Sequence, residues 1–506
     1  MVKLFFFLLF ACYLTPLAKL NYAVGIEISP SVQTGLKNSE FSLDTADNYC
    51  PHCYGYKGWL ALRIPLQNAL EYKNTPAMAS INLSAHWDSA FSIYSELPLQ
   101  RDLEAWQASK AGHNIPLGFN EININVPYTS YARWQYASQT AHGGAVQIGR
   151  FAVDLGPSPY TLVLGTAPAF HEALHWQQSL RKLRFDFVLV SLDAQLLGTP
   201  REVGIMPPED SEAWQQMHLT VPNQRRRIYA QPAKNLLVHK LSYHGSWGHI
   251  AAIEQSMVGG KPLDFRDFNP FMLWHNNFSD GYTKSSTTLE LALRPSKGHL
   301  FYWQLNAEDI ASPVGETSGE TFPNIFGILA GWQAQWLPNL RTSIDAIYTD
   351  PAFNNYRLPL LKMTSRQVYR SNYRHQDSAA FADTYIMDYP LGYLRGPDAL
   401  DLWFNLQYQP HAQWNFSLDL AWLRQGQSEL WDNFDSAATR SVLSGVVEEE
   451  KRAVIGAQFT QGDLSLQALL GYRALRNENH RQQSTQHQLI TQLNATWRWG
   501  IKSEKN

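Results

Sequence analysis

The 506-residue sequence lacks any long apolar run beyond its first residues. A membrane-spanning helix needs about 20 consecutive apolar residues, and no segment after Leu14 approaches that length. The mean hydropathy is −0.31, so polar residues interrupt the apolar ones throughout. These features exclude membrane helices and leave two classes, a soluble exported protein or a barrel whose strands alternate apolar and polar positions.

Charged residues are also scarce, at 17% of the chain, and the formal net charge is −3. The densest basic cluster is Arg225 to Arg227, which is typical of a solvated face or a pore lining. Nucleic-acid-binding surfaces carry many clustered lysines and arginines. No nucleic-acid partner is therefore expected.

Cysteine is nearly absent, with three residues in the chain. Cys12 lies in the apolar N-terminal segment, which leaves Cys50 and Cys53 in the motif "CPHC". A redox dithiol works at a helix N-terminus in a βαβ fold, where the helix dipole lowers the thiol pKa. Here the surrounding "NYCPHCYGYKGW" is rich in Gly, Tyr and Pro, so a small-loop disulfide between Cys50 and Cys53 is the prediction.

The N-terminus carries an export signal. A short basic "MVK" precedes the apolar "LFFFLLFACYL", which is too short to span a membrane. Cleavage is expected after Ala18 or Ala23, so the predicted signal peptide covers residues 1–23 and one mature domain covers residues 24–506.

Aromatic residues are abundant, at 13% of the chain with 17 Trp. They fall within segments that alternate with a period of two over about nine to eleven residues, the length of a tilted membrane strand. In "WNFSLDLAW" the apolar positions share one face, and the polar or small positions share the other: Trp414, Phe416, Leu418, Leu420 and Trp422 against Asn415, Ser417, Asp419 and Ala421. The alternative is a soluble β-sandwich or propeller, whose outward face usually carries more Lys and Glu.

The same alternation recurs along the chain. Further examples are "INLSAHW", "EININV", "LRFDFVL", "FYWQL", "LDLWFNLQY", "LSLQALLGY" and the segment from Leu489 to Trp499. Short turns such as Gly462-Asp463 alternate with long polar stretches such as residues 426–450. The predicted fold is all-β, a large antiparallel transmembrane β-barrel of about 16–18 strands with long surface loops.

One motif points to a different class of protein. "HEALH", His171 to His175, has the spacing of a zinc-peptidase helix, in which both imidazoles bind one metal and Glu172 acts as general base. A third ligand is missing nearby, because His175 is followed by "WQQSL" and the flanks are typical of strands. We therefore reject a metal site at His171, Glu172 and His175 and expect a polar helical turn in a loop or plug.

A longer stretch carries a family resemblance. It contains "GRFAVDLGPSPYTLVLGTAPAF" from Gly149, "NLLVHKLSYHGSWGHIAAIEQSMVGG" from Asn235, "FRDFNPFMLWHNNFSD" and "TLELALRPSKGHLFYWQLNAEDI". This order of motifs resembles the capsule-assembly outer-membrane proteins of the Wzi type. The resemblance implies a non-catalytic, lectin-like outer-membrane barrel that tethers capsular or other surface polysaccharide and needs no cofactor. Its implied partners are that polysaccharide, outer-membrane lipid or lipopolysaccharide, and the barrel-assembly machinery.

Sugars bind to aromatic faces that are flanked by amides and charged groups, so clusters of this composition are the predicted sugar contacts. Two clusters have this composition, "NPFMLWHNN" with Trp274, His275 and Asn276, and "YHGSWGH" with Trp247. For each cluster the alternative is a Trp of the interfacial aromatic girdle. A solute-conducting porin is the second hypothesis for the whole chain, and a secreted zinc peptidase is the third.

Overall fold

The computed structural model describes most of the chain from Leu20 to Ser503. The described residues are 20–28, 31–34, 71–87, 90–108, 114–136, 143–193, 231–260, 263, 265, 267–269, 282–309, 324–356, 359–371, 383–430 and 432–503. Cys50, Cys53, Trp274, His275 and Asn276 lie outside them, as do residues 1–19 of the predicted signal peptide. Within the described residues no helix is long and apolar enough to cross a membrane.

One antiparallel sheet of nineteen strands dominates the structure. The strands of the sheet are β1 (Leu20–Ile28), β2 (Ser31–Thr34), β3 (Ala79–Trp87), β4 (Phe91–Leu99), β5 (Thr129–Tyr136), β6 (Gly144–Phe151), β7 (His171–Leu180), β8 (Leu183–Leu192), β9 (Gln231–Gly245), β10 (Gly248–Gly260), β11 (Tyr282–Leu293), β12 (His299–Asp309), β13 (Ile325–Leu337), β14 (Leu340–Thr349), β17 (Ala399–His411), β18 (Trp414–Gln425), β19 (Glu448–Gln461), β20 (Leu464–Arg476) and β21 (Thr485–Ser503).

The sheet closes on itself into a barrel. From β3 to β14 and from β17 to β21, each strand pairs with the next along the chain. In addition β1 pairs with β3, β14 pairs with β17, and β21 returns to pair with β1. The short β2 also pairs with β21, so β1 and β2 occupy one position beside β21, and the described strands form a ring of eighteen positions. The predicted all-β barrel is thus confirmed, at the upper end of the predicted strand number.

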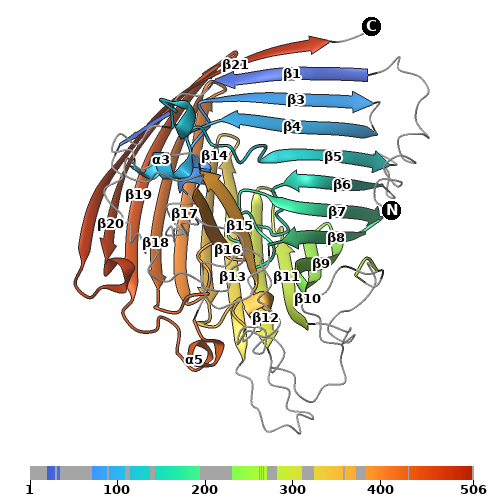
Figure 1. Ribbon diagram of the computed structural model, residues 1–506, viewed down its shortest axis with the longest axis vertical. Helices are drawn as coiled ribbons and strands as arrows, with labels where there is room; N and C mark the ends of the chain where they lie inside the picture. The colour runs from blue at the N-terminus through green and yellow to red at the C-terminus, as the bar shows by residue number, and fades with distance from the viewer. Residues whose placement is uncertain are drawn as a thin grey trace.

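The two rims of the barrel differ in the length of their connections (Figure 1). At one end, here called the short-turn rim, two-residue turns join β7 to β8, β9 to β10, β17 to β18 and β19 to β20. Gly462 opens the last of these turns with φ 58°, as its predicted turn role requires. At the other end, the long-loop rim, the connections carry most of the remaining chain.

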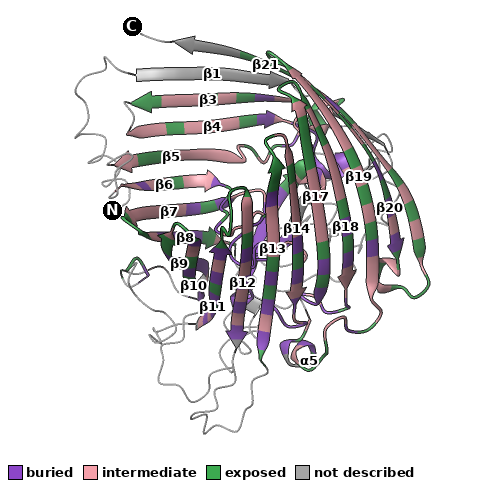
Figure 2. Ribbon diagram, turned by 180° about the vertical axis from the view of Figure 1, so that it is seen from behind, coloured by how far each residue is buried: buried purple, intermediate pink, exposed green. Residues whose placement is uncertain are grey.

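The alternation of the strands is confirmed. On β18, Leu420 and Trp422 point outward with exposed fractions of 39% and 43%, whereas Ala421 between them is buried. Figure 2 shows this alternation on neighbouring strands of the wall. An apolar outer surface on nearly every strand is unfavourable in water and matches lipid.

Two local predictions are wrong. "EININV" forms no strand, and its first residue ends a 3-10 helix, Phe119–Glu121. Asn123 instead donates to the hydroxyls of Tyr72 and Tyr128 and accepts from the backbone N–H of Asn125, which holds the segment in an irregular conformation. "HEALH" is no helical turn, since it begins strand β7.

The signal-cleavage prediction bears on β1. Strand β1 begins at Leu20 and pairs with β3 along its whole length, from Leu20 opposite Trp87 to Ile28 opposite Ala79. Cleavage after Ala18 leaves this strand whole, whereas cleavage after Ala23 removes four of its residues.

Candidate functional site

The long-loop half of the lumen contains a folded plug. It is built from residues 71–78, the described residues of the connection 100–128 with helix α3 (Leu103–Ala108), the connection 152–170, and the described residues of 350–398 with the hairpin of β15 (Thr364–Ser371) and β16 (Asp383–Pro390). Figure 1 shows α3 and the hairpin inside the curve of the sheet. These segments pack against the inward faces of the strands in a buried core whose members include Leu164, Val190, Leu236, Ile253 and Met363.

Side chains of the wall fasten the connection 152–170 in place. Gln304 on β12 uses its amide oxygen to accept hydrogen bonds from the backbone N–H of Leu162, at 2.9 Å, and the hydroxyl of Thr161, at 3.1 Å. Gln255 on β10 accepts from the backbone N–H of Leu164 at 2.9 Å. Because these backbone groups are buried, leaving them unpaired would cost about 1–3 kcal/mol each.

A buried carboxylate organises the wall beside this connection. The Oε1 atom of Glu290 on β11 accepts from Lys240 Nζ at 2.7 Å and from His249 Nε2 at 2.8 Å, while its Oε2 accepts from Gln304 at 2.8 Å. Lys240 Nζ also donates to the carbonyl of Leu155 in the plug. Both carboxylate oxygens of Glu290 and the ammonium of Lys240 are thus paired, as burial demands.

The β15–β16 hairpin is held by its own buried ion pair. The guanidinium of Arg366 donates to both carboxylate oxygens of Asp388 at 2.8 Å, and the two side chains are 0% and 1% exposed. Lys234 on β9 joins the hairpin to the wall by donating to the hydroxyl of Thr364 at 3.0 Å. The fork geometry gives the pair its specificity as well as its energy.

Within the plug, the β15 end of the hairpin also contacts the connection 100–128. Ser371 donates to the carboxylate of Asp102 at 2.7 Å, and Asn125 exchanges two hydrogen bonds with the backbone of Arg370. Burial raises the pKa of the Asp102 carboxyl to about 6, although hydrogen bonds from Ser371 and the backbone of Glu104 favour its charged form.

The plug also reaches the remaining wall. Arg395 of the plug pairs with Asp401 on β17 at 3.0 Å, and Tyr393 donates its hydroxyl to the same carboxylate. Farther round, Arg473 on β20 pairs with the buried Glu450 on β19 at 2.9 Å. Buried ion pairs therefore occur at this depth on both sides of the barrel.

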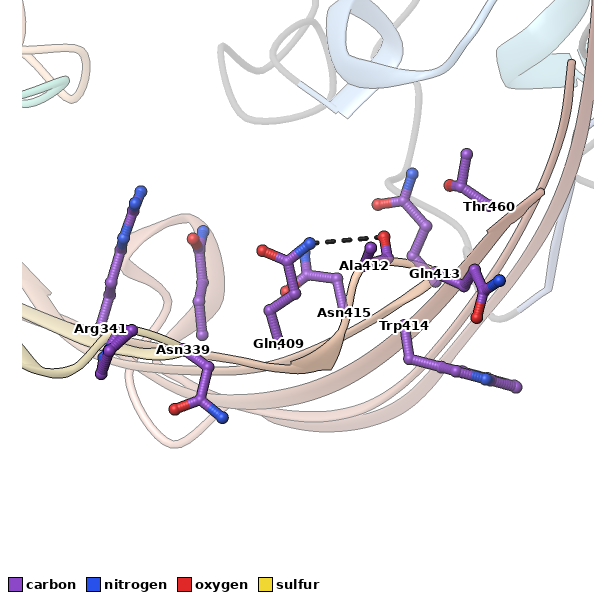
Figure 3. Close-up of a pocket in the computed structure, with 11 residues that line it drawn as sticks. Asn339, Arg341, Gln409, Ala412, Gln413, Trp414, Asn415 and Thr460 are labelled. Carbon is purple, nitrogen blue, oxygen red and sulfur yellow. Dashed lines mark hydrogen bonds between the residues drawn. The ribbon is translucent and has the colours of Figure 1, made fainter. Parts of the chain in front are cut away.

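The short-turn half of the lumen is different, because it holds an open polar hollow of about 310 Å³. Its lining comes from β14, β17, β18 and β19 and their turns: Pro338, Asn339, Arg341, Gln407, Gln409, Ala412, Gln413, Trp414, Asn415, Gln458 and Thr460. Figure 3 shows Arg341 rising from the wall on one side and the Trp414 ring extending on the other. Trp414 stacks on Phe416 of the outer surface, so the lumen side of the hollow is formed mainly by amides.

The predicted sugar-contact residues are placed only in part. Trp247 occupies the two-residue turn between β9 and β10 on the short-turn rim, 41% exposed. The connection between β10 and β11 belongs instead to the long-loop rim. It contains Trp274, His275 and Asn276, which are outside the described residues. The other members of the Trp247 cluster diverge, since Tyr243 is exposed on the outer surface and His249 bonds to Glu290 in the lumen.

The zinc-peptidase motif has the wrong geometry for its chemistry. On β7, His171 and His175 both face the lumen, where His171 Nε2 lies 3.3 Å from the carbonyl of Gly165 and His175 Nε2 lies 3.0 Å from Asp186. Glu172 is on the outer face and pairs with Arg150. A general base on the far side of the wall cannot assist a metal held by the two histidines.

Sequence reasoning missed the groups that hold the plug. Lys240 on β9, Glu290 on β11 and Gln304 on β12 all occupy inward positions of their strands. The alternation of the sequence places polar residues at these positions. Arg366 and Asp388 carry no such signal, because their segment matches none of the alternating patterns.

No protein-family profile matches the sequence, and no curated protein matches it. Among solved structures, the chain is similar to Wzi, an outer membrane protein involved in group 1 capsule assembly in Escherichia coli and described as a carbohydrate-binding β-barrel. The identity is 12%, the match covers 94% of this chain and 84% of that one, and the TM-score is 0.47.

Two further similar structures belong to other barrels. OprD of Pseudomonas aeruginosa is 5% identical, with 95% of each chain covered and a TM-score of 0.42. OccAB3 of Acinetobacter baumannii is 9% identical, with 96% of this chain and 100% of that one covered and a TM-score of 0.42.

The class of the protein follows from its own geometry. An even number of antiparallel strand positions closes into a ring, apolar residues cover the outside, polar residues line the inside, and short turns alternate with long connections at opposite rims. This combination defines a β-barrel of the outer-membrane type.

Proposed function

We propose that the chain resides in the outer membrane and retains polysaccharide at the cell surface as a non-catalytic barrel. The observation that carries this proposal is the plug. A solute channel needs a continuous water-filled passage, whereas here wall side chains hydrogen-bond the connection 152–170 and the β15–β16 hairpin across the long-loop half of the lumen.

The orientation follows from the rims. In outer-membrane barrels short turns face the periplasm and long connections face the outside. The connections of the long-loop rim therefore meet the surface polysaccharide, and the connection with Trp274, His275 and Asn276 remains the proposed contact there. Trp247, on the short-turn rim, fits the periplasmic aromatic girdle better than a surface site.

Lipid and assembly partners belong to the same proposal. The outward residues, among them Leu420, Leu489 and Trp497, give lipid contact. Strand β21 presents the exposed Trp497 and Trp499 on the outer surface, and the barrel-assembly machinery is proposed as the partner that inserts the barrel.

The test compares polysaccharide on cells with polysaccharide shed into the medium, before and after deletion of the gene. Deletion is expected to move polysaccharide from the cell-bound to the shed fraction, and the restored gene is expected to reverse this change. Unchanged retention would refute the tether and favour the second hypothesis, a solute channel. The observation in favour of a channel is the polar hollow in the short-turn half of the lumen.

A further inference from the structure

The inward face of the barrel carries a row of carboxamides on strands β17 to β21, near the short-turn rim. Gln407 on β17 lies opposite Ser417, two residues from Asn415 on β18. The register then places Gln458 opposite Asn415, Gln467 opposite Gln458, and Asn494 opposite Gln467. We call these five residues the amide row. Arg341 on β14 extends it, lying opposite Gln407.

Part of the amide row has unused hydrogen-bonding capacity. Within the described residues the side chains of Gln407, Asn415 and Arg341 make no hydrogen bond or ion pair. At the far end, Asn494 donates to Gln467 at 2.9 Å, but its own buried amide oxygen has no partner among the described atoms. Each amide offers two donors and an acceptor with two lone pairs, so the row presents both kinds of group along its length.

From this arrangement we propose that the amide row and Arg341 form a glycan-binding track at the periplasmic mouth of the barrel. The inference rests on the proposed function in its membrane orientation, and it adds a second sugar site to the surface contact. Adjacent strands lie about 4.8 Å apart, so the directly opposed amides from Asn415 to Asn494 are spaced like successive pyranose units of a chain.

The chemistry of the lining selects this class of ligand. Vicinal hydroxyls both donate and accept, which matches carboxamides. A phosphate-rich ligand would need several cations, and the hollow contains only Arg341 among its lining residues. A peptide would need apolar pockets, whereas the lining is mostly Asn, Gln and Thr. The single guanidinium favours a chain with occasional carboxylates, such as uronate units.

Two sources share this chemistry, the surface polysaccharide on its way outward and the amino-sugar chains of the cell wall. The experiment separates them by titrating the purified barrel, in a detergent without a sugar headgroup, with maltohexaose, hexagalacturonate and chitohexaose. Binding of either of the first two points to surface polysaccharide, and preferential binding of chitohexaose points to the cell wall.

The decisive variant is Gln407→Ala/Asn415→Ala/Gln458→Ala, expected to weaken oligosaccharide binding at least about tenfold, or about 1.4 kcal/mol. Arg341→Gln is expected to weaken hexagalacturonate binding severalfold more than it weakens maltohexaose binding, because only the former ligand carries carboxylates. Tyr408→Phe, next to Gln407 but on the outer face, is the matched control and should bind as the unaltered chain does. Heat-modifiable gel mobility shows that each variant is folded.

The site is refuted if none of the three oligosaccharides binds the unaltered chain, or if the triple variant binds as tightly as the unaltered chain. The tether is tested separately by the gene deletion. If deletion of the gene sheds polysaccharide but the triple variant binds oligosaccharide normally, only the glycan-binding track is refuted. If deletion leaves polysaccharide on the cells but the triple variant binds oligosaccharide weakly, only the tether is refuted.

Discussion

The two halves of the lumen treat their polar groups in opposite ways. In the long-loop half the inward charges are buried and paired, as in Arg366–Asp388 and Lys240–Glu290. In the short-turn half Gln407 and Asn415 lack a partner among the described residues, and they line an open hollow. Since an unpaired polar group is costly only when it is buried, the first half is built for packing and the second is available to bind.

The largest effect is expected from breaking the ion pair within the plug. Arg366→Ala or Asp388→Ala leaves one buried charge without its partner and should destabilise the hairpin by about 3–5 kcal/mol. Faster hydrogen exchange in β15 and β16 and new protease cleavage in residues 350–398 would report this loss.

The matched control removes both charges. Arg366→Met/Asp388→Leu should be close to neutral, because buried pairs replaced by apolar groups of similar volume often retain stability. If the single variants exchange as slowly as the unaltered chain, the contrast between a packed and an open half is wrong.

A charge on the outer surface should have the next largest effect. Leu420→Lys places an ammonium near the middle of β18 on the lipid-facing side and should cost about 2–4 kcal/mol. Ser417→Lys, on the lumen side of the same strand, should cost much less. Chemical unfolding in lipid vesicles measures both variants, and equal losses would argue against a lipid-facing outer surface.

A smaller effect is expected from pH at the plug. Because burial raises the folded-state pKa of Asp102 to about 6, the stabilising contribution of this group is fully present below its ordinary pKa and is lost as pH rises through 6. Lowering the pH from 7 to 5 should therefore slow hydrogen exchange in α3, by the equivalent of about 1 kcal/mol. Asp102→Asn should remove this dependence, and a dependence that survives the substitution would assign it to another group.

The smallest effect is expected at Glu172. Its pair with Arg150 is partly exposed, so Glu172→Gln should change stability by less than about 1 kcal/mol and leave polysaccharide retention unchanged. A loss of retention with normal folding would reopen a catalytic role for this carboxylate.

The sequence predicts the wall better than the plug. The alternating segment Leu400 to Tyr408 lies within β17, and Trp414 to Trp422 lies within β18, because lipid on one side and lumen on the other impose a period of two. The plug depends on pairings between distant residues, such as Ser371 with Asp102 and Asn125 with Arg370, for which local patterns give no signal.

"HEALH" shows why a motif can mislead. A spacing of four is even, so a strand places His171 and His175 on one face just as a helix does. The difference lies in Glu172, which a strand turns to the opposite face. Only the period of the flanking residues distinguishes the two structures.

Ion conductance of the purified barrel in a planar bilayer tests the central claim, that the plug closes the long-loop half of the lumen. The unaltered chain should show no large, stable open-pore conductance, and a variant lacking residues 356–390 should conduct strongly. Large, stable openings in the unaltered chain, with the same amplitude as in the shortened variant, would contradict the claim.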